Sequence, residues 1–341
     1  MHDSLLPLLV CPVSGQPLTL VDAVRDEHGI QSGRLATPEG RSYPIEGYVP
    51  RFAAEESYAR SFGKEWNLFS QVQLDSGNGT TISRTRFVAL TGMEPEALRG
   101  RRVLEAGCGS GRFLEVLASA GAEVVGVDMS AAIGPCERNL RRFSNVNVVC
   151  ADLNHMPFWP GSFDFVYSFG VLMCTPDTRA SFLSLVPHAR PGGEVCVWVY
   201  GCRGPRWLPR PYQVYGHVAR GLPDPVLNRA IDVYAKVFLP LGRLPLVGSL
   251  SRLVFPISDL TQKRQGEDGY DNGRTFPPKL VRDWARLNTY DAFTPQFTRQ
   301  HSFAEVCAWF AEAGLTDVRP RPTRVAVLGR RPPQDMHTAP H

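Results

Sequence analysis

The sequence has eight cysteines, yet no two of them are spaced as C-x-x-C. Structural zinc sites and iron–sulfur clusters draw their ligands from pairs of this kind, so we expect no bound metal of either type. Several of the cysteines fall in apolar, strand-like runs, where a thiol packs as a small hydrophobic side chain. The set expected to behave in this way is Cys11, Cys108, Cys136, Cys150, Cys174, Cys196, Cys202 and Cys307.

Long uninterrupted hydrophobic runs are also missing. Residues 1–10 are apolar but are broken by Pro7 and have no basic residue before them, which does not fit a signal peptide. The most apolar later stretch, residues 237–256, is interrupted by Pro240, Arg243, Pro245 and Arg252 and does not fit a membrane span. We therefore expect a cytoplasmic protein with no membrane-spanning segment.

The chain also lacks a large excess of charge of either sign. The formal net charge is +4 over 341 residues, whereas a nucleic-acid-binding protein normally carries a dense basic face. Hydrophobic residues make up 43% of the chain and charged residues 21%, which is typical of a globular protein. A folded protein without a nucleic-acid partner is the expectation, and the composition leaves its oligomeric state open.

Composition divides the chain into six segments. Short apolar runs alternate with helical segments in the third of them, and this alternation is typical of parallel βαβ units. The fourth segment breaks the alternation with many proline, glycine and aromatic residues, and the fifth resumes it. The segments are 1–53 (β-rich), 54–100 (partly helical), 101–200 (βαβ core), 201–298 (an insertion), 299–330 (the C-terminal part of the core) and 331–341 (a tail expected to be disordered).

Individual elements of the core can be predicted from these runs. We expect a first buried strand at 102–106, followed by a glycine-rich turn and a helix at 112–120 that ends at Gly121. A turn at 190–193 is expected before the fifth strand. The other predicted strands are 123–127, 146–150, 163–168, 195–200, 316–319 and 324–328, and the other predicted helices are 175–189 and 303–313.

Three glycines at alternate positions, Gly107, Gly109 and Gly111, follow the first predicted strand. Because glycine has no Cβ, the backbone there can turn sharply and approach a ligand closely. Open α/β sheets bind ligands at this edge, the carboxyl ends of the strands. Asp128 ends the second predicted strand, where a carboxylate can accept hydrogen bonds from the two hydroxyls of a ribose.

Dinucleotide-binding domains share this arrangement, so we compare the glycine loop with their characteristic sequence pattern. The pattern G-x-G-x-x-G would require glycine at position 112 or 114, and the chain has Arg112 and Leu114 there. Glu105, two residues before the first glycine, suits a cationic ligand better than a pyrophosphate. The loop therefore favours a nucleoside ligand without phosphates.

The run Glu105-Ala106-Gly107-Cys108-Gly109-Ser110-Gly111 resembles motif I of class I S-adenosylmethionine-dependent methyltransferases. Further motifs of that family follow in the same order along the chain. The resemblance implies a Rossmann-like sheet of seven strands, mostly parallel with a closing antiparallel strand. The further motifs are Ala151-Asp152-Leu153 with Met156-Pro157-Phe158, Phe163-Asp164-Phe165-Val166-Tyr167-Ser168 with Gly170-Val171-Leu172, and Arg190-Pro191-Gly192-Gly193.

The same resemblance implies S-adenosylmethionine as the cofactor. Glu105 and the glycine loop would hold its methionine end, Asp128 its ribose, and Asp152 the amino group of its adenine. Close relatives often carry two histidines where this chain has Met173 and Cys174, so a catalytic histidine is not expected there. The residues expected to bind or line the cofactor are Trp66, Glu105, Gly107, Cys108, Gly109, Gly111, Asp128, Met129, Asp152, Leu153, Ser168 and Phe169.

The N-terminal segment resembles a small zinc-ribbon family that includes the activator subunit of several tRNA and protein methyltransferases. The likeness rests on Leu8 to Ser14 and on Gly40 to Phe52. A ribbon of this type needs four ligands in two knuckles, and here Cys11 remains alone, with Ser14 at the second cysteine position. Thr37 and Gly40 occupy the region of the second knuckle, so we expect a degenerate ribbon without metal.

Segment 54–100 contains Phe62-Gly63-Lys64-Glu65-Trp66-Asn67-Leu68-Phe69, with Gln73-Leu74-Asp75 after it. It resembles a segment that folds over the cofactor in many bacterial small-molecule methyltransferases. Phe62, Trp66 and Phe69 fall at helical spacing, which equally fits packing. The segment is therefore expected to be a helical linker that covers the cofactor site.

The methyl acceptor is expected to be a small, apolar or aromatic molecule of the kind made in secondary metabolism, held under the insertion 201–298. No Asn-Pro-Pro-Tyr motif follows the fourth predicted strand, and the pair Pro135-Cys136 follows the second strand and is expected to be structural. Tyr290, Asp291 and His301 are the candidates for a general base. The insertion's aromatic residues are Trp207, Tyr212, Tyr215, Tyr234, Phe238, Phe255 and Phe276, and they equally fit a core of the insertion itself.

Two other functions stay open at this point. RNA methylation is suggested by the ribbon-like N-terminus and by a group of arginines near the C-terminus. A catalytically silent partner that binds adenosylmethionine is the second, although the intact glycine loop and Asp128 count against it. The arginines are Arg319, Arg321, Arg324, Arg330 and Arg331.

Overall fold

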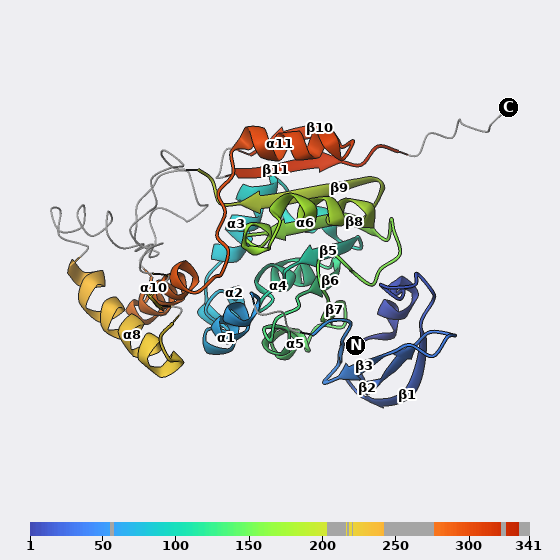
Figure 1. Ribbon diagram of the computed structural model, residues 1–341, viewed down its shortest axis with the longest axis horizontal. Coiled ribbons are helices and arrows are strands. Elements are labelled where there is room, and N and C mark those ends of the chain that lie inside the picture. Colours follow the sequence, from blue (N-terminus) through green and yellow to red (C-terminus); the bar gives the residue numbers. More distant parts are fainter. Residues whose placement is uncertain are drawn as a thin grey trace.

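A seven-stranded sheet forms the centre of the computed structural model, which describes residues 1–54, 58–202, 216, 218–219, 221–241, 276–321 and 325–333. Its strand order is β10-β11-β9-β8-β5-β6-β7 (Figure 1). Strands β5 to β9 are parallel to one another, and β11 is antiparallel to both β9 and β10. The expected fold class is confirmed. The strands are β5 (Arg102–Ala106), β6 (Glu123–Val127), β7 (Val146–Val149), β8 (Phe163–Phe169), β9 (Ala189–Val199), β10 (Thr316–Pro320) and β11 (Val325–Arg330).

Helices cover both faces of this sheet, because its parallel strands are apolar on both sides. One face packs against α3, α4 and α5, with Phe87 and Leu114 in its core. The other packs against α6 and α11, where the rings of Phe182 and Phe310 stack at 4.7 Å. The helices are α3 (Ile82–Thr91), α4 (Arg112–Ser119), α5 (Ile133–Leu140), α6 (Thr178–Leu185) and α11 (Phe303–Glu312).

Two elements differ from the expected pattern. The helix predicted over 175–189 is shorter, because the carboxylate of Asp177 caps α6 by accepting a hydrogen bond from the Ala180 amide at 3.0 Å. Short 3₁₀ turns flank it, η3 (Leu172–Cys174) and η4 (Val186–His188). The turn predicted at 190–193 lies inside β9 as an irregularity, since Ala189 and Glu194 pair with nearby residues of β8.

The N-terminal unit is an antiparallel sheet, as expected for a β-rich segment. It is joined to the core by backbone hydrogen bonds at the β7 edge, where the amide of Phe52 donates to the Cys150 carbonyl at 2.7 Å. Leu5 and Leu9 share one apolar cluster with Phe158 of the core. Its elements are η1 (Asp3–Leu8), β1 (Thr19–Asp26), β2 (Gly29–Ala36), β3 (Ser42–Glu46) and β4 (Val49–Pro50).

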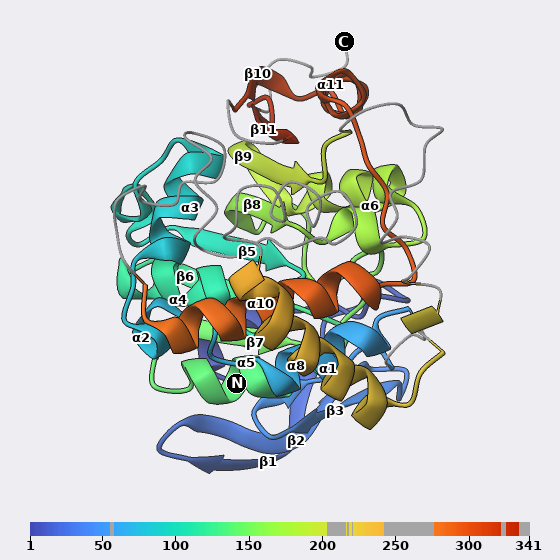
Figure 2. The same cartoon turned by 90° about the vertical axis from the view of Figure 1, so that its left-hand side faces the viewer.

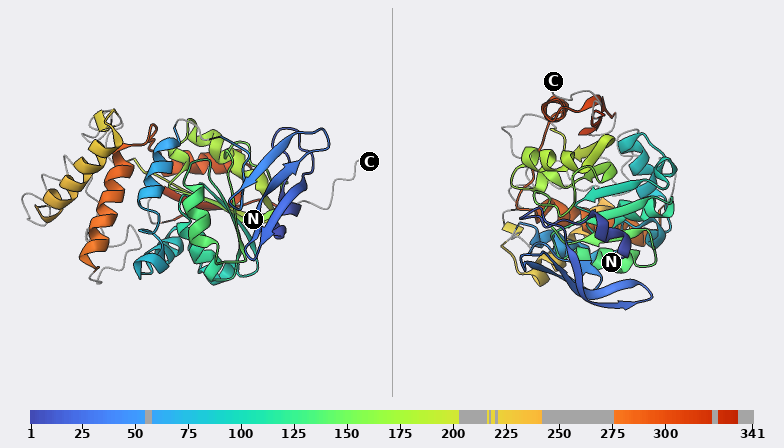
Figure 3. Two further views of the ribbon diagram at one scale, coloured as in Figure 1. Left: turned by 90° about the horizontal axis from the view of Figure 1, so that it is seen from below. Right: turned by 90° about the vertical axis from the view of Figure 1, so that its right-hand side faces the viewer.

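The linker and the described part of the insertion are helical. Helix α1 (Arg60–Leu68) lies beside α8 (Asp224–Leu241) and α10 (Pro278–Phe293), and the three pack in front of the sheet in Figure 2. An ion pair of 2.8 Å joins Lys64 on α1 to Asp224 on α8. Helices α8 and α10 stand at one end of the molecule and the N-terminal sheet at the other (Figure 3).

Much of the expected lid falls outside the described residues. Of its aromatic residues, Phe276 packs partly buried beside Ile82 and Trp284. In the described part of the chain, no helix combines the length and the apolar character that a membrane crossing requires. The aromatic residues whose side chains lie outside the description are Trp207, Tyr212, Tyr215, Tyr234, Phe238 and Phe255.

Candidate functional site

The glycine loop between β5 and α4 has the backbone that its sequence predicts. Gly107, Gly109 and Gly111 have φ angles of +82°, +52° and +93°, a region that other residues rarely adopt. A Cβ atom at Gly107 would lie 2.4 Å from Cγ1 of Val171, and one at Gly111 would lie 2.6 Å from Cδ1 of Leu140. Both backbone angle and packing therefore require glycine at these positions.

Asp128 lies directly beside this loop, at the end of β6. One carboxylate oxygen accepts a hydrogen bond from the Gly109 amide at 2.9 Å. The other accepts from the amide and the hydroxyl of Ser130, at 2.8 and 2.7 Å. The structure thus brings together the two features that the sequence assigned to the methionine and ribose parts of the cofactor.

Glu105 is buried beneath the loop, with a residue exposure of 3%. Its Oε2 has no hydrogen-bond partner among the described residues. Burial raises the pKa of Glu105 well above its usual range and the Asp128 charge adds to this, while Tyr167 and Arg112 oppose it. A buried carboxyl of this kind is stabilised in its charged form by a cation, which fits the ammonium of a methionine moiety.

Three other expected cofactor residues have side chains in the core. The Sγ of Cys108 lies 3.8 Å from that of Cys136. The Ser168 hydroxyl donates to the Ala106 carbonyl at 2.7 Å, and the Phe169 ring packs in an aromatic cluster on the α3 face. These three side chains thus have partners in the core, and their expected part in binding or lining the cofactor stays a prediction.

The expected adenine side lies after β6 and β7. The Asp152 carboxylate is 2.9 Å from Nδ1 of His155, and the Leu153 carbonyl accepts a hydrogen bond from Ser184. Met129 is buried, and its sulfur accepts a hydrogen bond from the Tyr58 hydroxyl at 3.0 Å. Tyr58 was not expected here, because it precedes α1 in a segment without any periodic pattern.

Trp66 covers the glycine loop from α1. A Cβ atom at Gly109 would lie 3.0 Å from the indole Nε1. Asn67 holds the same helix against the chain after β6 by donating to the Ala131 carbonyl at 3.3 Å. Phe69, one turn further on, is buried beside Tyr290, with ring centroids 6.3 Å apart. The linker therefore lies over the loop while its outer aromatic residue packs against α10.

The three candidates for a general base lie in different surroundings. The Tyr290 ring is buried in the α8–α10 cluster, and burial raises its pKa to about 12. The Nε2 of His301 is 3.1 Å from the Thr178 hydroxyl, and its ring packs against Trp309. Asp291 instead accepts a hydrogen bond of 2.9 Å from Tyr200, immediately after β9.

Asp291 thus meets Tyr200 at the carboxyl edge of the sheet, where the backbone of His301 also pairs with Gly201. Burial raises the pKa of Asp291, and the Tyr200 hydrogen bond and the Arg86 charge oppose that shift. A carboxyl group with a raised pKa is a stronger base than an ordinary one when it is ionised.

Glu65 is a further buried carboxyl group at this place, which the sequence analysis did not single out. Its exposure is 1%, and its Oε2 has no hydrogen-bond partner in the described part of the chain. Burial raises its pKa well above the usual range, and the charge of Asp291 adds to this. The available signal was its helical spacing from Phe62 and Phe69, which places it on the apolar side of α1.

The N-terminal unit has a tight turn at Cys11, and its resemblance to a zinc ribbon stays a prediction. The Cys11 sulfur is 3.1 Å from the Tyr43 hydroxyl and accepts a hydrogen bond from the Ser14 amide at 3.5 Å. The Gly40 amide donates to the Thr37 carbonyl, closing the second turn. Across the described residues, no group of three or more histidine, cysteine or acidic side chains is arranged to hold a metal.

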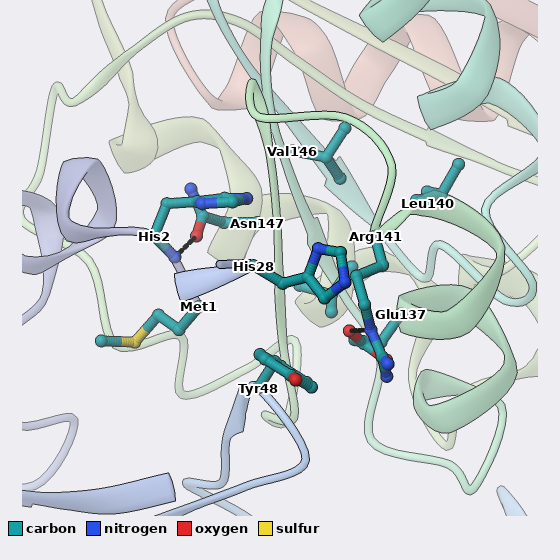
Figure 4. A pocket seen from close by; sticks show the side chains of 10 residues that line it. Met1, His2, His28, Tyr48, Glu137, Leu140, Arg141, Val146 and Asn147 are labelled. Atoms are coloured by element: carbon teal, nitrogen blue, oxygen red, sulfur yellow. Dashed lines mark hydrogen bonds and ion pairs between the residues drawn. The ribbon is translucent and has the colours of Figure 1, made fainter. Parts of the chain in front are cut away.

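A pocket away from the glycine loop lies between the N-terminal unit and the α5–β7 region (Figure 4). Several of its polar groups are paired with one another. Arg141 bonds to Glu137 at 2.6 Å and stacks on Tyr48 at 4.3 Å, and the His2 amide donates to Asn147 at 2.8 Å. We assign this pocket to the junction of the two units rather than to ligand binding.

Comparison with known proteins agrees with the loop geometry. Residues 104–197 match the family described as a methyltransferase domain. The ubiquinone biosynthesis O-methyltransferase of Coxiella burnetii is 32% identical over 100 residues, covering 29% of this chain and 43% of the relative. The expected class I methyltransferase domain, with S-adenosylmethionine as its cofactor, is confirmed.

The similarity to other proteins extends further along the chain but is weaker. The biotin biosynthesis bifunctional protein BioHC of Cellvibrio japonicus is 28% identical over 209 residues, covering 60% of this chain and 39% of that protein. A solved complex with the Haloferax volcanii Trm112 methyltransferase activator has a TM-score of 0.43 at 14% identity, covering 81% of this chain and 100% of that one. The chain spans less than half of the length of both curated relatives.

Proposed function

We propose that this chain, in which residues 104–197 form a class I methyltransferase domain, transfers a methyl group from S-adenosylmethionine to a small molecule. The observation that carries the proposal is the left-handed glycine loop with Asp128 hydrogen-bonded to its centre. The cofactor, when bound, supplies a methyl group activated by a sulfonium.

The chain's own residues would bind and orient the two reactants. Asp128 would hold the ribose hydroxyls, Asp152 the adenine amine, and Glu105 the ammonium. Trp66 would cover the loop and exclude water, which strengthens electrostatic interactions inside the site. Asp291 would serve the acceptor, because it lies at the strand edge next to Tyr200.

A small acceptor is favoured by two observations. Helices α8 and α10 of the insertion bring an apolar cluster against α1, directly beside the loop. The curated relatives are named for the biosynthesis of ubiquinone and of biotin, both small molecules. We infer that the acceptor lies beneath the insertion 201–298 and is largely apolar.

RNA as the acceptor is less well supported, because three of the C-terminal arginines form ion pairs or hydrogen bonds with groups of the sheet. Arg319 and Arg330 lie 3.7 and 3.3 Å from Glu194, so they share one carboxylate. Arg331 donates to the Ala189 carbonyl at 2.6 Å. Arg324 lies outside the described residues.

Calorimetry with S-adenosylhomocysteine tests the proposal. We expect binding to the full chain, and its loss in Asp128→Ala and in Gly109→Val, whose larger side chain would meet Trp66. Circular dichroism of both variants provides the control for folding. Binding of NAD in place of adenosylhomocysteine would contradict the proposal, and cofactor binding without transfer to any acceptor would support a silent partner instead.

A further inference from the structure

Helix α8 rests on the rest of the molecule through one of its sides. Leu227 and Ile231, one helical turn apart, are buried in a cluster with Phe69 of the linker and Tyr290 of α10. This spacing is typical of a helix that packs on a core through a single apolar side. The other apolar residues of α8 lie on a different side of the helix.

The outer side of α8 carries a stripe of exposed apolar residues. Val226, Val233 and Val237 are seven and four residues apart, so they fall on one side of the helix. Their exposed fractions are 51%, 53% and 46%, and Leu222, one turn before Val226, is 36% exposed. Of the ten large hydrophobic side chains that are exposed in the described part of the chain, five lie on α8 or just before it, which is typical of an interaction surface. The five are Val218, Leu222, Val226, Val233 and Val237.

Two cationic residues border this stripe on the same flank. Arg229 follows Val226 by three residues and Lys236 follows Val233 by three, so both lie directly beside the stripe, two turns apart. Both residues are exposed. The aliphatic part of such a side chain lies along apolar groups, while its charged end reaches outward.

The two acidic residues of α8 are turned toward the neighbouring helices by ion pairs. Asp224 pairs with Lys64 of α1 at 2.8 Å, and Asp232 pairs with Arg286 of α10 at 2.5 Å. Their negative charge is therefore balanced within the protein. The outer side of α8 presents an apolar stripe with a positively charged border.

The place of α8 in the fold directs this side away from the sheet. Helix α8 (yellow) stands at one end of the molecule, with α10 between it and the sheet (Figures 1 and 3). Because the inner side of α8 packs toward α10 and α1, the stripe and its cations face outward at that end. The N-terminal unit lies at the opposite end of the molecule.

We propose that the outer side of α8 binds the surface of a membrane that contains anionic lipids. The valines of the stripe enter the boundary between headgroups and acyl chains, as the apolar face of an interfacial helix does. Arg229 and Lys236 meet the phosphates of the lipid headgroups, which attract basic side chains near the surface. The inference concerns attachment to a lipid surface and stands independently of the proposed methyl transfer.

The charges of α8 disfavour a second copy of the chain as the partner. In an antiparallel pair of α8 helices, the same flank of each helix would meet, so Arg229 and Lys236 of both copies would lie on one side of the contact. The carboxylates of α8 are engaged with α1 and α10 and do not neutralise them there. Like charges that face one another across an interface cost free energy, whereas an anionic surface is attracted by the same cations.

Co-sedimentation of the full chain with lipid vesicles tests the role of the cations. We expect binding to vesicles of phosphatidylcholine and phosphatidylglycerol in equal parts, and about 25-fold weaker binding to phosphatidylcholine alone, because each cation contributes about fivefold. Arg229→Gln combined with Lys236→Gln should weaken binding to the anionic vesicles to the same extent, and added salt should weaken that of the parent. Arg41→Gln combined with Arg101→Gln removes the same net charge from exposed positions elsewhere and should leave binding within about twofold of the parent.

A second pair of variants tests the apolar stripe. Val226→Asn combined with Val233→Asn removes apolar area from the contact and should weaken binding to the anionic vesicles about tenfold or more. Val13→Asn combined with Val24→Asn makes the same chemical change at two exposed valines of the N-terminal unit and should leave binding unchanged. Thermal unfolding followed by circular dichroism confirms that each variant is folded, as expected for substitutions at exposed positions.

Three results would overturn this inference. They are no binding of the parent chain to the anionic vesicles, equal binding to neutral and anionic vesicles, and binding that neither α8 variant weakens. If light scattering instead finds a dimer that Val226→Asn combined with Val233→Asn dissociates, and vesicles are not bound, the partner of α8 is a second copy. Adenosylhomocysteine calorimetry reports separately on the proposed function, because its failure in the parent chain would leave the vesicle result unchanged.

Discussion

Two glycines at the ends of α4 allow the cost of a steric clash in the glycine loop to be measured separately from the cost of a left-handed backbone. Gly111 and Gly121 stand at opposite ends of α4 and have nearly equal φ angles, +93° and +91°. They differ in what a methyl group would meet. At Gly111 it would lie 2.6 Å from Leu140, whose side chain is buried, whereas at Gly121 it would lie 3.3 Å from Arg99, an exposed and flexible side chain.

Gly121→Ala should therefore report the backbone term alone. A left-handed alanine costs about 1–2 kcal/mol relative to glycine. Gly111→Ala carries the same cost and also overpacks the core, which adds about 1–3 kcal/mol. We expect it to lower the free energy of unfolding by about 2–5 kcal/mol in total.

Urea unfolding followed by circular dichroism measures both variants against the parent. The m-value should stay constant if the change acts on the folded state. Equal losses in Gly111→Ala and Gly121→Ala would show that the contact with Leu140 adds no cost, and the reasoning about close packing of the loop would then be wrong.

Two other predictions follow from buried groups. Burial lowers the pKa of His188 to about 4, below the value of about 6.5 in an unfolded chain, so the unfolded state binds the proton first and stability falls as pH drops from about 6.5 to 4. His188→Gln should reduce the stability difference between pH 7 and pH 4.5 by about 2 kcal/mol in urea unfolding, and an unchanged difference would refute this. Elemental analysis should find no stoichiometric zinc in the parent chain, and zinc that disappears in Cys11→Ala would contradict the degenerate ribbon.

Local signals were sufficient for the core of the fold. The strands predicted at 102–106 and 123–127 are the observed β5 and β6, because continuous apolar runs bounded by turns are typical of buried parallel strands. The glycine loop was equally predictable from the sequence. Its three glycines encode a left-handed backbone within a few residues, and Asp128 is placed by the strand that precedes it.

Element ends and side-chain directions were less predictable. The helix predicted over 175–189 begins later, because Asp177 caps it, and ends sooner, because a 3₁₀ turn follows Leu185. The hydroxyl of Ser168 and the ring of Phe169 lie in the core, where neighbouring strands and helices decide which way a side chain points. No pattern within β8 carries that information.

The sequence by itself determined the sheet, the glycine loop and the position of Asp128, since each depends on residues close together along the chain. Only the tertiary structure decided that Tyr200 donates a hydrogen bond to Asp291, although the two residues are far apart in the sequence. It likewise placed the N-terminal unit at the β7 edge and Tyr58 beside Met129. The physical reason is that burial and the charge of distant neighbours set the ionisation of a carboxyl group, and chain folding alone brings those neighbours together.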